Sequence, residues 1–303
     1  MRKIEHLSYL LSQFFWRHVS DGHPLAMITV LSTEGSTYSK TGSQMLVNTA
    51  GELQGMLSGG CLEGDLAERS KGIIESGIAE IITYDLRGDD EVFGLGIGCE
   101  GVIKILIQPL SLANDYQPFH ALLKALESAS EAEMPLADAS KKIGVSCIKA
   151  PVRLLILGAG LDAEPLVVFA VTLGWEVNVS DYRPALVDRL KKNNDVMAEC
   201  IPHHDIALGF DLSRFDAAIV MSHNLDADRS YLSALADSSI DYIGLLGPPH
   251  RRDRLMRDLE VAASSLRDRL HSPVGKRIGG RGPAAIALEI VAELQAYFYI
   301  DTT

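Results

Sequence analysis

A short apolar run followed by a glycine-rich turn constrains the fold of this chain more than any other feature. Residues 152 to 157 are apolar and β-like, residues 158 to 163 read G-x-G-x-x-A, and residues 164 to 173 continue with helical spacing. A strand, a tight glycine turn and a helix in this order place free N–H groups and the positive helix end where a pyrophosphate binds. The segment predicts a Rossmann-like parallel-sheet domain, with Gly158 and Gly160 in contact with a nucleotide.

Later apolar runs extend the same pattern. Residues 176 to 180 are followed by Asp181, a little over 20 residues after the first glycine, where an acid can accept hydrogen bonds from a ribose diol. Runs at 217 to 221 and 242 to 246 complete an alternating α/β pattern. Residues 222 to 224, Ser-His-Asn, are predicted at the carboxyl edge of the sheet, where ligands bind. An NAD(P)-dependent oxidoreductase is one candidate function, although the fold alone does not establish it.

The first half of the chain has a different texture. Apolar runs at 25 to 31, 44 to 47 and 102 to 107 are separated by Gly, Ser, Thr and Asn, which indicates a β-rich unit. Helical spacing predicts helices over about residues 4 to 19 and 62 to 77. Residues 117 to 150 are rich in Ala, Glu and Lys and are predicted to form two helical pieces that connect the two halves. We therefore predict an α/β protein with three parts. These are an N-terminal β-rich α/β domain over residues 1–112, a helical connector over 113–150 and a Rossmann-like domain over 151–303.

Composition and charge exclude several classes of protein. The chain has 303 residues, of which 47% are hydrophobic, enough for two ordinary cores. A net charge of −12 without a basic block opposes phosphate backbones, so we expect no nucleic-acid partner. No segment approaches the roughly 20 apolar residues of a membrane span, and the start does not resemble a secretory leader. Four scattered cysteines favour a reducing cytoplasm over a disulfide scaffold.

Two glycine-rich segments each contain one cysteine. Residues 58 to 64 read Ser-Gly-Gly-Cys-Leu-Glu-Gly around Cys61, and residues 94 to 101 read Gly-Leu-Gly-Ile-Gly-Cys-Glu-Gly around Cys99. Glycines allow positive φ and close approach of the backbone to a ligand, so both cysteines are predicted to face a sulfur-reactive or metal-bearing molecule. The alternative is that they are small apolar fillers of tight loops. Cys147 and Cys200 are interpreted as structural, and no spacing indicates zinc.

Five segments along the chain carry a family resemblance. They are Glu34-Gly35-Ser36-Thr37, Ser58-Gly59-Gly60-Cys61-Leu62-Glu63, Gly96-Ile97-Gly98-Cys99, Tyr242-Ile243-Gly244-Leu245-Leu246-Gly247, and Pro273-Val274-Gly275 with Ile278-Gly279-Gly280-Arg281-Gly282-Pro283. In order and spacing they resemble the XdhC/CoxI family of xanthine dehydrogenase accessory proteins. The resemblance implies a cysteine-bearing N-terminal domain followed by a Rossmann-like domain.

The resemblance also implies a function. Members bind molybdenum cofactor (molybdopterin), assist its sulfuration with a cysteine desulfurase and insert it into apo-molybdoenzymes of the xanthine dehydrogenase type. This favours a cytoplasmic cofactor chaperone over an enzyme that turns over a small substrate. The sequence does not set the oligomeric state of such a chaperone, but uncovered sheet edges favour a homodimer.

The cysteine loops supply the predicted cofactor site. Thiolate is a soft ligand suited to molybdenum and to sulfur transfer, so Cys61 and Cys99 are predicted to contact the metal or carry sulfur. The neighbouring residues predicted to bind the cofactor are Ser58, Gly59, Gly60, Glu63 and Gly98. Glu63 is a candidate to hydrogen-bond a pterin amine or act as a base, and a solvated acid at a helix start is the alternative.

Three further positions bear on anion binding. Arg281 is predicted beside the N-terminus of the last helix, a favourable place for an anion, although packing of its flanking glycines also explains the segment. Members of the family tend to carry an arginine where this chain has Ser39, which is followed by Lys40. Glu100 stands where a small or amide residue is more usual, and its carboxylate would repel a pterin phosphate. An interaction scaffold that binds both partners without any ligand is therefore a third candidate.

Overall fold

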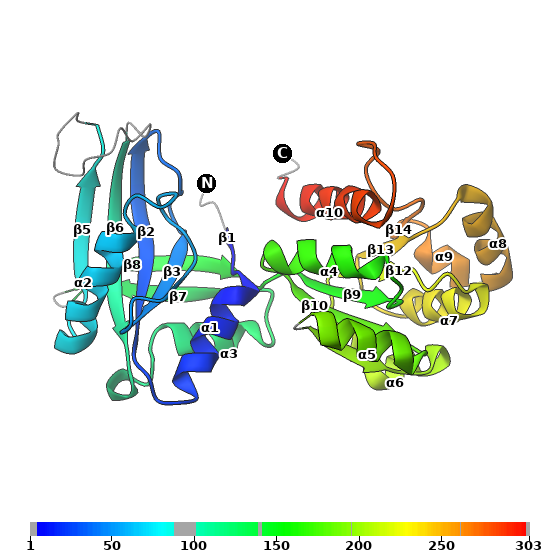
Figure 1. Cartoon of the computed structure of the whole chain (residues 1–303), viewed down its shortest axis with the longest axis horizontal. Helices are drawn as coiled ribbons and strands as arrows, with labels where there is room; N and C mark the ends of the chain where they lie inside the picture. The colour runs from blue at the N-terminus through cyan, green and yellow to red at the C-terminus, as the bar shows by residue number, and fades with distance from the viewer. Residues whose placement is uncertain (1–4, 88–100, 139–140, 195, 261, 301–303) are drawn as a thin grey trace. The chain divides into compact units, whose positions relative to one another are not determined.

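The computed structural model describes residues 5–87, 101–138, 141–194, 196–260 and 262–300. The chain forms two compact units, Met1–Ala150 and Pro151–Thr303, which run from blue to green and from green to red in Figure 1. Both units combine a sheet with helices, and the predicted α/β class is confirmed.

A five-stranded antiparallel sheet forms the centre of the first unit, in the order β4-β3-β2-β6-β5. Its strands are β2 (Leu25–Gly35), β3 (Gln44–Asn48), β4 (Leu53–Gln54), β5 (Glu80–Asp85) and β6 (Gly101–Leu110). The three apolar runs predicted as strands are β2, β3 and β6. The register of β2 against β6 shifts between Val30 and Ser32, which indicates a β-bulge.

Helices cover both faces of this sheet. On one face α2 (Glu63–Ser76) packs Leu66 and Ile73 against strand residues such as Ile105, and it closely matches the predicted helix. On the other face lie α1 (Tyr9–Val19) and α3 (Phe119–Leu126). The first helix was predicted from about residue 4, but it begins at Tyr9 because Glu5 and His6 form a short strand, β1, instead.

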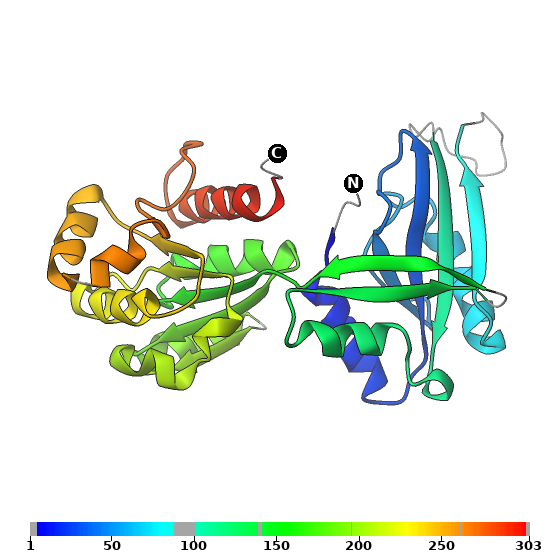
Figure 2. The ribbon, with the colours of Figure 1, turned by 180° about the vertical axis from the view of Figure 1, so that it is seen from behind.

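The prediction of two helical pieces between residues 117 and 150 is wrong for the second piece. After the short 3₁₀ turn Leu112–Asn114 and α3, the strands β7 (Glu131–Ala137) and β8 (Lys142–Lys149) form an antiparallel hairpin. β1 pairs in parallel with β8, so the order of this small sheet is β1-β8-β7. The hairpin runs across the long strands β2 and β6 (Figure 1 and Figure 2).

Alternation, not composition, decides the structure of β7. Met134 and Leu136 are buried, while Glu133 and Pro135 next to them are exposed, which is the two-residue period of a strand. Pro135 would also interrupt a helix, whereas an edge strand such as β7 tolerates it. The content of Ala, Glu and Lys therefore does not predict the secondary structure of this segment.

The second unit contains a six-stranded, wholly parallel sheet in the order β11-β10-β9-β12-β13-β14. Its strands are β9 (Arg153–Leu157), β10 (Glu176–Asp181), β11 (Met197–Cys200), β12 (Ala217–Val220), β13 (Tyr242–Leu245) and β14 (Leu270–His271). This is the doubly wound order of a Rossmann-like sheet, and the prediction is confirmed.

The helices of this unit divide between the two faces of the sheet. They are α4 (Ala163–Thr172), α5 (Pro184–Asn193), α6 (Ile206–Gly209), α7 (Leu225–Ala236), α8 (Pro249–Leu259), α9 (Ala262–Leu266) and α10 (Pro283–Tyr299), with 3₁₀ turns at His203–Asp205 and Leu212–Arg214. Leu154 and Ile156 pack with residues of α4, α5 and α10, whereas Leu155 and Leu157 pack with residues of α7, α8 and α9. Burial on both faces explains why these strands read as continuous apolar runs.

The strand order reverses between β9 and β12. The chain proceeds from β9 outward to β11 on one side, then returns to β12 and proceeds to β14 on the other. Loops at the carboxyl ends of β9, β10 and β12 therefore meet at this point, which is where ligands bind in such sheets. Among the described helices, none is both long and apolar enough to cross a membrane.

Candidate functional site

The loop that carries Cys61 is folded around a carboxylate. Glu63, the first residue of α2, accepts N–H hydrogen bonds from Leu57 at 2.9 Å, Ser58 at 2.8 Å and Gly60 at 2.9 Å, and the hydroxyl of Ser58 also donates to it. The Ser58 hydroxyl in turn accepts from the N–H of Leu62 at 2.7 Å. These bonds fix residues 57 to 62 as a rigid platform at the start of the helix.

The hydrogen bonds within the loop explain why the pKa of Glu63 is lowered. Burial alone would raise the pKa of this carboxyl group, but the hydrogen bonds from Ser58 and the backbone outweigh burial and hold the pKa below its ordinary value. Both carboxylate oxygens are engaged inside the loop and the residue is only 8% exposed. Glu63 and Ser58 therefore shape the platform, and their predicted contact with a cofactor stays a prediction.

The outer surface of the platform is made by glycines and a thiol. Gly59 and Gly60 have φ values of +74° and +109°, and a Cβ added to Gly60 would have no atom within 4 Å. Cys61 is a free, partly buried cysteine that immediately precedes the N-cap residue of α2. The thiol thus lies at the positive end of a helix, beside backbone that is open to close approach.

An exposed aromatic ring borders the same place. Tyr38 is 61% exposed, and its ring lies 3.4 Å from the position of a Cβ on Gly59. It lines a small cavity together with Thr37, Leu57, Ser58, Cys61, Leu62, Leu86 and Ile103. The cavity volume is about 10 Å³, the space of one water molecule, so a larger ligand would rest on the platform rather than inside it.

The family departure at Ser39 has a structural consequence. Ser39 is buried, and its hydroxyl donates to the carbonyl oxygen of Met56 at 3.3 Å, which ties the Tyr38 segment to the cysteine platform. Lys40 is exposed, and its ammonium donates to the carbonyl oxygen of Thr37 at 3.2 Å. The cation at position 40 therefore lies on the segment that borders Cys61.

The second cysteine segment lies outside the described residues. This applies to Gly98, Cys99 and Glu100, so their predicted roles stay predictions. Gly101 is described, and it pairs with Gly35 at the end of β2. The described part of the chain contains no cluster of three or more His, Cys, Asp or Glu side chains suited to a metal ion.

Other residues of the second unit pack closely against its glycine turn. At Gly158, whose φ is +129°, a Cβ would lie 2.5 Å from the carbonyl oxygen of Met221. At Gly160 it would lie 2.6 Å from Oδ1 of Asp162, the N-cap residue of α4. The Asp162 carboxylate thus lies beside the turn at the N-terminal end of α4, where its negative charge would oppose a phosphate.

Asp181 is also engaged within the protein. Its carboxylate is completely buried and accepts from the N–H of Ala159 at 2.7 Å and from two nitrogens of the Arg183 guanidinium at 2.8 and 2.7 Å. Burial raises the pKa of Asp181, but the bonds from Arg183 and Ala159 outweigh it and the pKa is lowered. A ribose diol would have to displace Arg183 to reach this acid.

Residues 222 to 224 follow β12 at the carboxyl edge of the sheet, as predicted, but the sequence did not predict which residues they and Asp228 pair with. His223, held at φ +61°, donates from Nε2 to Asp162 at 2.6 Å, and this ring is exposed. Nearby, Ser222 donates to Asp228, which also pairs with Arg251 at 2.6 Å. Asp162, the acid inside the G-x-G-x-x-A turn, was the signal in the sequence that could have indicated the pairing with His223.

In the sequence, Arg281 is far from both the Cys61 platform and the glycine turn at residues 158 to 163. It is exposed and precedes Gly282, the N-cap residue of α10, as its sequence position indicated. Glu289 of the same helix accepts from the N–H groups of Ile278 and Gly279, which folds the glycine segment onto α10. Anion binding by Arg281 stays a prediction.

Comparisons with known proteins agree with this arrangement. A profile described as the XdhC and CoxI family matches residues 18–85, and one described as the XdhC Rossmann domain matches residues 154–294. A Bacillus subtilis protein, described as a probable xanthine dehydrogenase subunit, is 29% identical over 91% of this chain and 94% of its own length. The molybdenum cofactor insertion chaperone PaoD of Escherichia coli is 23% identical, over 90% and 83% respectively.

A solved structure shares the whole architecture. A crystal structure from Bacillus halodurans, described as a xanthine dehydrogenase, superimposes with a TM-score of 0.77 and 27% identity. The match covers 98% of this chain and 97% of that one. Both units, and not the parallel sheet alone, are therefore shared.

Proposed function

Because the chain belongs to the XdhC and CoxI family, we propose that it binds molybdenum cofactor and inserts it into an apo-molybdoenzyme of the xanthine dehydrogenase type. The observation that carries the proposal is the Cys61 platform: a free thiol at a helix N-terminus, beside a glycine with open space above it. A relative described as an insertion chaperone supports the role.

The chemistry of the platform suits this cargo. A thiol is a soft donor that molybdenum accepts. The rigid backbone and the glycines, which carry no side chains, allow a flat pterin to approach closely. Glu63 does not compete for the metal because its oxygens are held by residues 57 to 60.

The proposal extends to partners. We infer that the protein holds the cofactor while a cysteine desulfurase supports its sulfuration, and that Cys99 joins Cys61 at the cargo. We also infer a homodimer in the cytoplasm, which light scattering of the purified protein will test. The proposed function includes no nicotinamide cofactor, because Asp162 puts a negative charge beside the glycine turn and Asp181 is already bonded to Arg183.

Cofactor retention tests the proposal. The protein is isolated from cells that make molybdenum cofactor, and bound molybdenum and pterin are measured for the wild type, Cys61→Ala and Cys200→Ala. We expect Cys61→Ala to retain at least about tenfold less, as for loss of a metal-site residue. Cys200→Ala is the matched control because Cys200 is exposed on the other unit. Equal content in all three proteins would contradict a role for Cys61.

A further inference from the structure

Two neighbouring helices of the second unit carry very few polar residues on any side. They are α4 and α10, which lie side by side on one face of the parallel sheet (Figure 1 and Figure 2). Apart from aliphatic and aromatic residues, the ten residues of α4 include only Glu164 and Thr172, and the 17 residues of α10 include only Glu289, Glu293 and Gln295. A helix at the surface of a protein normally turns charged residues to the solvent. The composition of α4 and α10 therefore indicates helices that are covered on both sides.

One side of this helix pair is buried and the other side meets water. Toward the sheet, α10 buries Ala287, Ile290 and Leu294. On the opposite side, exposed and half-buried residues recur at the spacing of one helix face. We call this side the outer face and define it by Pro165, Val168 and Thr172 of α4 and by Ala284, Leu288, Ala292 and Ala296 of α10. Val168 and Leu288 are each 48% exposed, and a contiguous apolar surface of this kind marks an interaction site.

The charged residues of the two helices lie off the outer face and are bonded within the unit. Glu293 accepts from the hydroxyl of Tyr242 and from the N–H of Gly275, both at 2.7 Å. Glu289 accepts from two N–H groups of the loop before α10, and Glu164 pairs with an arginine of α5 at 3.0 Å. The outer face therefore presents no charged side chain to a partner.

The absence of charge favours a second copy of this chain as the partner. Two copies each carry a net charge of −12 and repel each other, so a surface without carboxylates is where they approach at the least cost. A different protein is normally recognised through complementary charges as well, and the outer face has none to offer. An apolar face is complementary to itself, as an interface about a two-fold axis requires. Permanent homodimer interfaces are also more apolar than those of transient complexes.

We propose that the outer face binds the outer face of a second copy across a two-fold axis. The alanines of α10 allow close approach of the backbones, and Val168 and Leu288 lose their contact with water. With 17 residues, α10 is about 25 Å long, close to the side of a standard interface patch of about 800 Å² per partner. The proposal goes beyond the proposed function, because it assigns the surface through which two copies bind and does not depend on the Cys61 platform.

Sedimentation velocity of the full chain tests the proposal. The wild type is expected to have the mass of two chains from about 1 to about 100 μM, as for a dissociation constant below the micromolar range. Because the contact is apolar, this mass should stay the same between about 0.05 and about 0.5 M NaCl, where exposed ion pairs become screened. The mass of one chain at every concentration, or a dimer that salt dissociates, overturns the proposal.

Matched variants locate the interface, with circular dichroism as the check that each is folded. Leu288→Glu puts one carboxylate from each copy into the apolar contact, so the dissociation constant of the dimer is expected to rise at least about hundredfold. Val168→Glu tests the α4 side of the outer face in the same way. Leu208→Glu is the control, because Leu208 is an exposed leucine of α6, which packs on the other face of the sheet. A dimer as stable in both outer-face variants as in the control overturns the surface.

Cofactor content separates this proposal from the function proposed above. Leu288→Glu is expected to be a monomer that retains as much molybdenum cofactor per chain as the wild type, and Cys61→Ala to be a dimer that retains less. A wild-type dimer without cofactor would remove the chaperone proposal and leave the interface. A wild-type monomer whose transfer of cofactor to apo-xanthine dehydrogenase is lost in Leu288→Glu would assign the outer face to that enzyme, and would overturn the second copy as its partner.

Discussion

Two glycine turns, each ahead of a helix, differ in what fills the space that the glycines leave. At Gly60 a new Cβ would meet nothing within 4 Å, whereas at Gly158 it would meet the backbone of Met221 and at Gly160 the carboxylate of Asp162. An inward-facing acid holds each turn, Glu63 in one and Asp181 in the other. The same sequence signal therefore marks an open platform in the first unit and close internal packing in the second.

The largest effect is expected from Gly158→Ala. The new Cβ would lie 2.5 Å from a carbonyl oxygen at a φ of +129°, so overpacking and backbone strain add. We expect a loss of about 2 to 5 kcal/mol in the free energy of unfolding of the second unit. Thermal unfolding checks this, and a stable variant would show that the turn has room for a ligand after all.

The next effect is expected from Glu63→Gln, which weakens four hydrogen bonds inside the platform. The expected cost is about 1 to 3 kcal/mol, with less cofactor retained. Hydrogen exchange at the amides of Leu57, Ser58 and Gly60 reports the loosened loop directly. Amides protected as in the wild type would mean that the carboxylate does not hold the platform.

Acid should have the same effect as that substitution. The pKa of Glu63 is lower in the folded protein than its ordinary value of 4.5, so its contribution to stability is complete above about pH 4.5 and is lost as the pH falls through the lowered pKa. Hydrogen exchange of these amides, measured down through pH 4, should show that loss in the wild type. Glu63→Gln should lack it, and identical pH profiles would exclude Glu63 as the group responsible.

A smaller change is expected at the sheet edge. Wild-type protein should bind NAD⁺ weakly, because Asp162 places a negative charge over Gly160 and Arg183 covers Asp181. Asp162→Asn removes one of these obstacles and is expected to tighten binding about tenfold, equivalent to about 1.4 kcal/mol. Tight binding to the wild type, unchanged by the substitution, would restore the oxidoreductase as a candidate.

Gly64→Ala should have the smallest effect, and a favourable one. Gly64 lies in the first turn of α2 with nothing within 4 Å of a new Cβ, so alanine should stabilise the helix by about 0.5 kcal/mol. Cofactor content should stay at the wild-type level. A loss of cofactor would indicate that the ligand extends over the helix as well as the platform.

The fold was predictable where the period of the sequence was unambiguous. The glycine turn after residues 152 to 157 identified that apolar run as a strand of the parallel sheet, and the spacing after Cys61 gave α2 nearly to its ends. The β7–β8 hairpin was not predictable from composition, because tertiary burial of Met134 and Leu136 decided its structure. Local propensity yields to packing at such positions.

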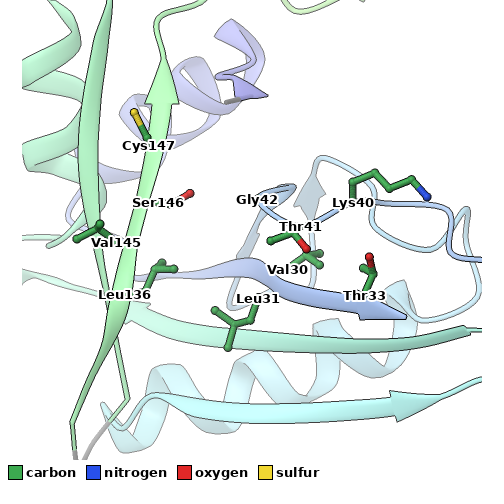
Figure 3. Close-up of a pocket in the computed structure, with 10 residues that line it drawn as sticks. All are labelled: Val30, Leu31, Thr33, Lys40, Thr41, Gly42, Leu136, Val145, Ser146 and Cys147. Carbon is green, nitrogen blue, oxygen red and sulfur yellow. The ribbon is translucent and has the colours of Figure 1, made fainter. Parts of the chain in front are cut away.

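The site was predictable in its elements but not in its contacts. Cys61 does precede a helix, and Gly59 and Gly60 do adopt positive φ. The spacing of Glu63 and Asp181 could not show that each carboxylate turns inward to bind backbone N–H groups. Likewise, one cavity of the first unit is lined by residues of both β2 and β8, which are more than a hundred positions apart in the sequence, so only the fold brings them together (Figure 3).

Cofactor transfer tests the central claim most directly. The protein is loaded with molybdenum cofactor, separated from free cofactor and mixed with an apo-xanthine dehydrogenase, whose activity is then measured. We expect the wild type to activate the enzyme and Cys61→Ala to fail, with Cys200→Ala as active as the wild type. Failure of the wild type to retain or transfer the cofactor, or full transfer by Cys61→Ala, would contradict a chaperone that holds its cargo on this platform.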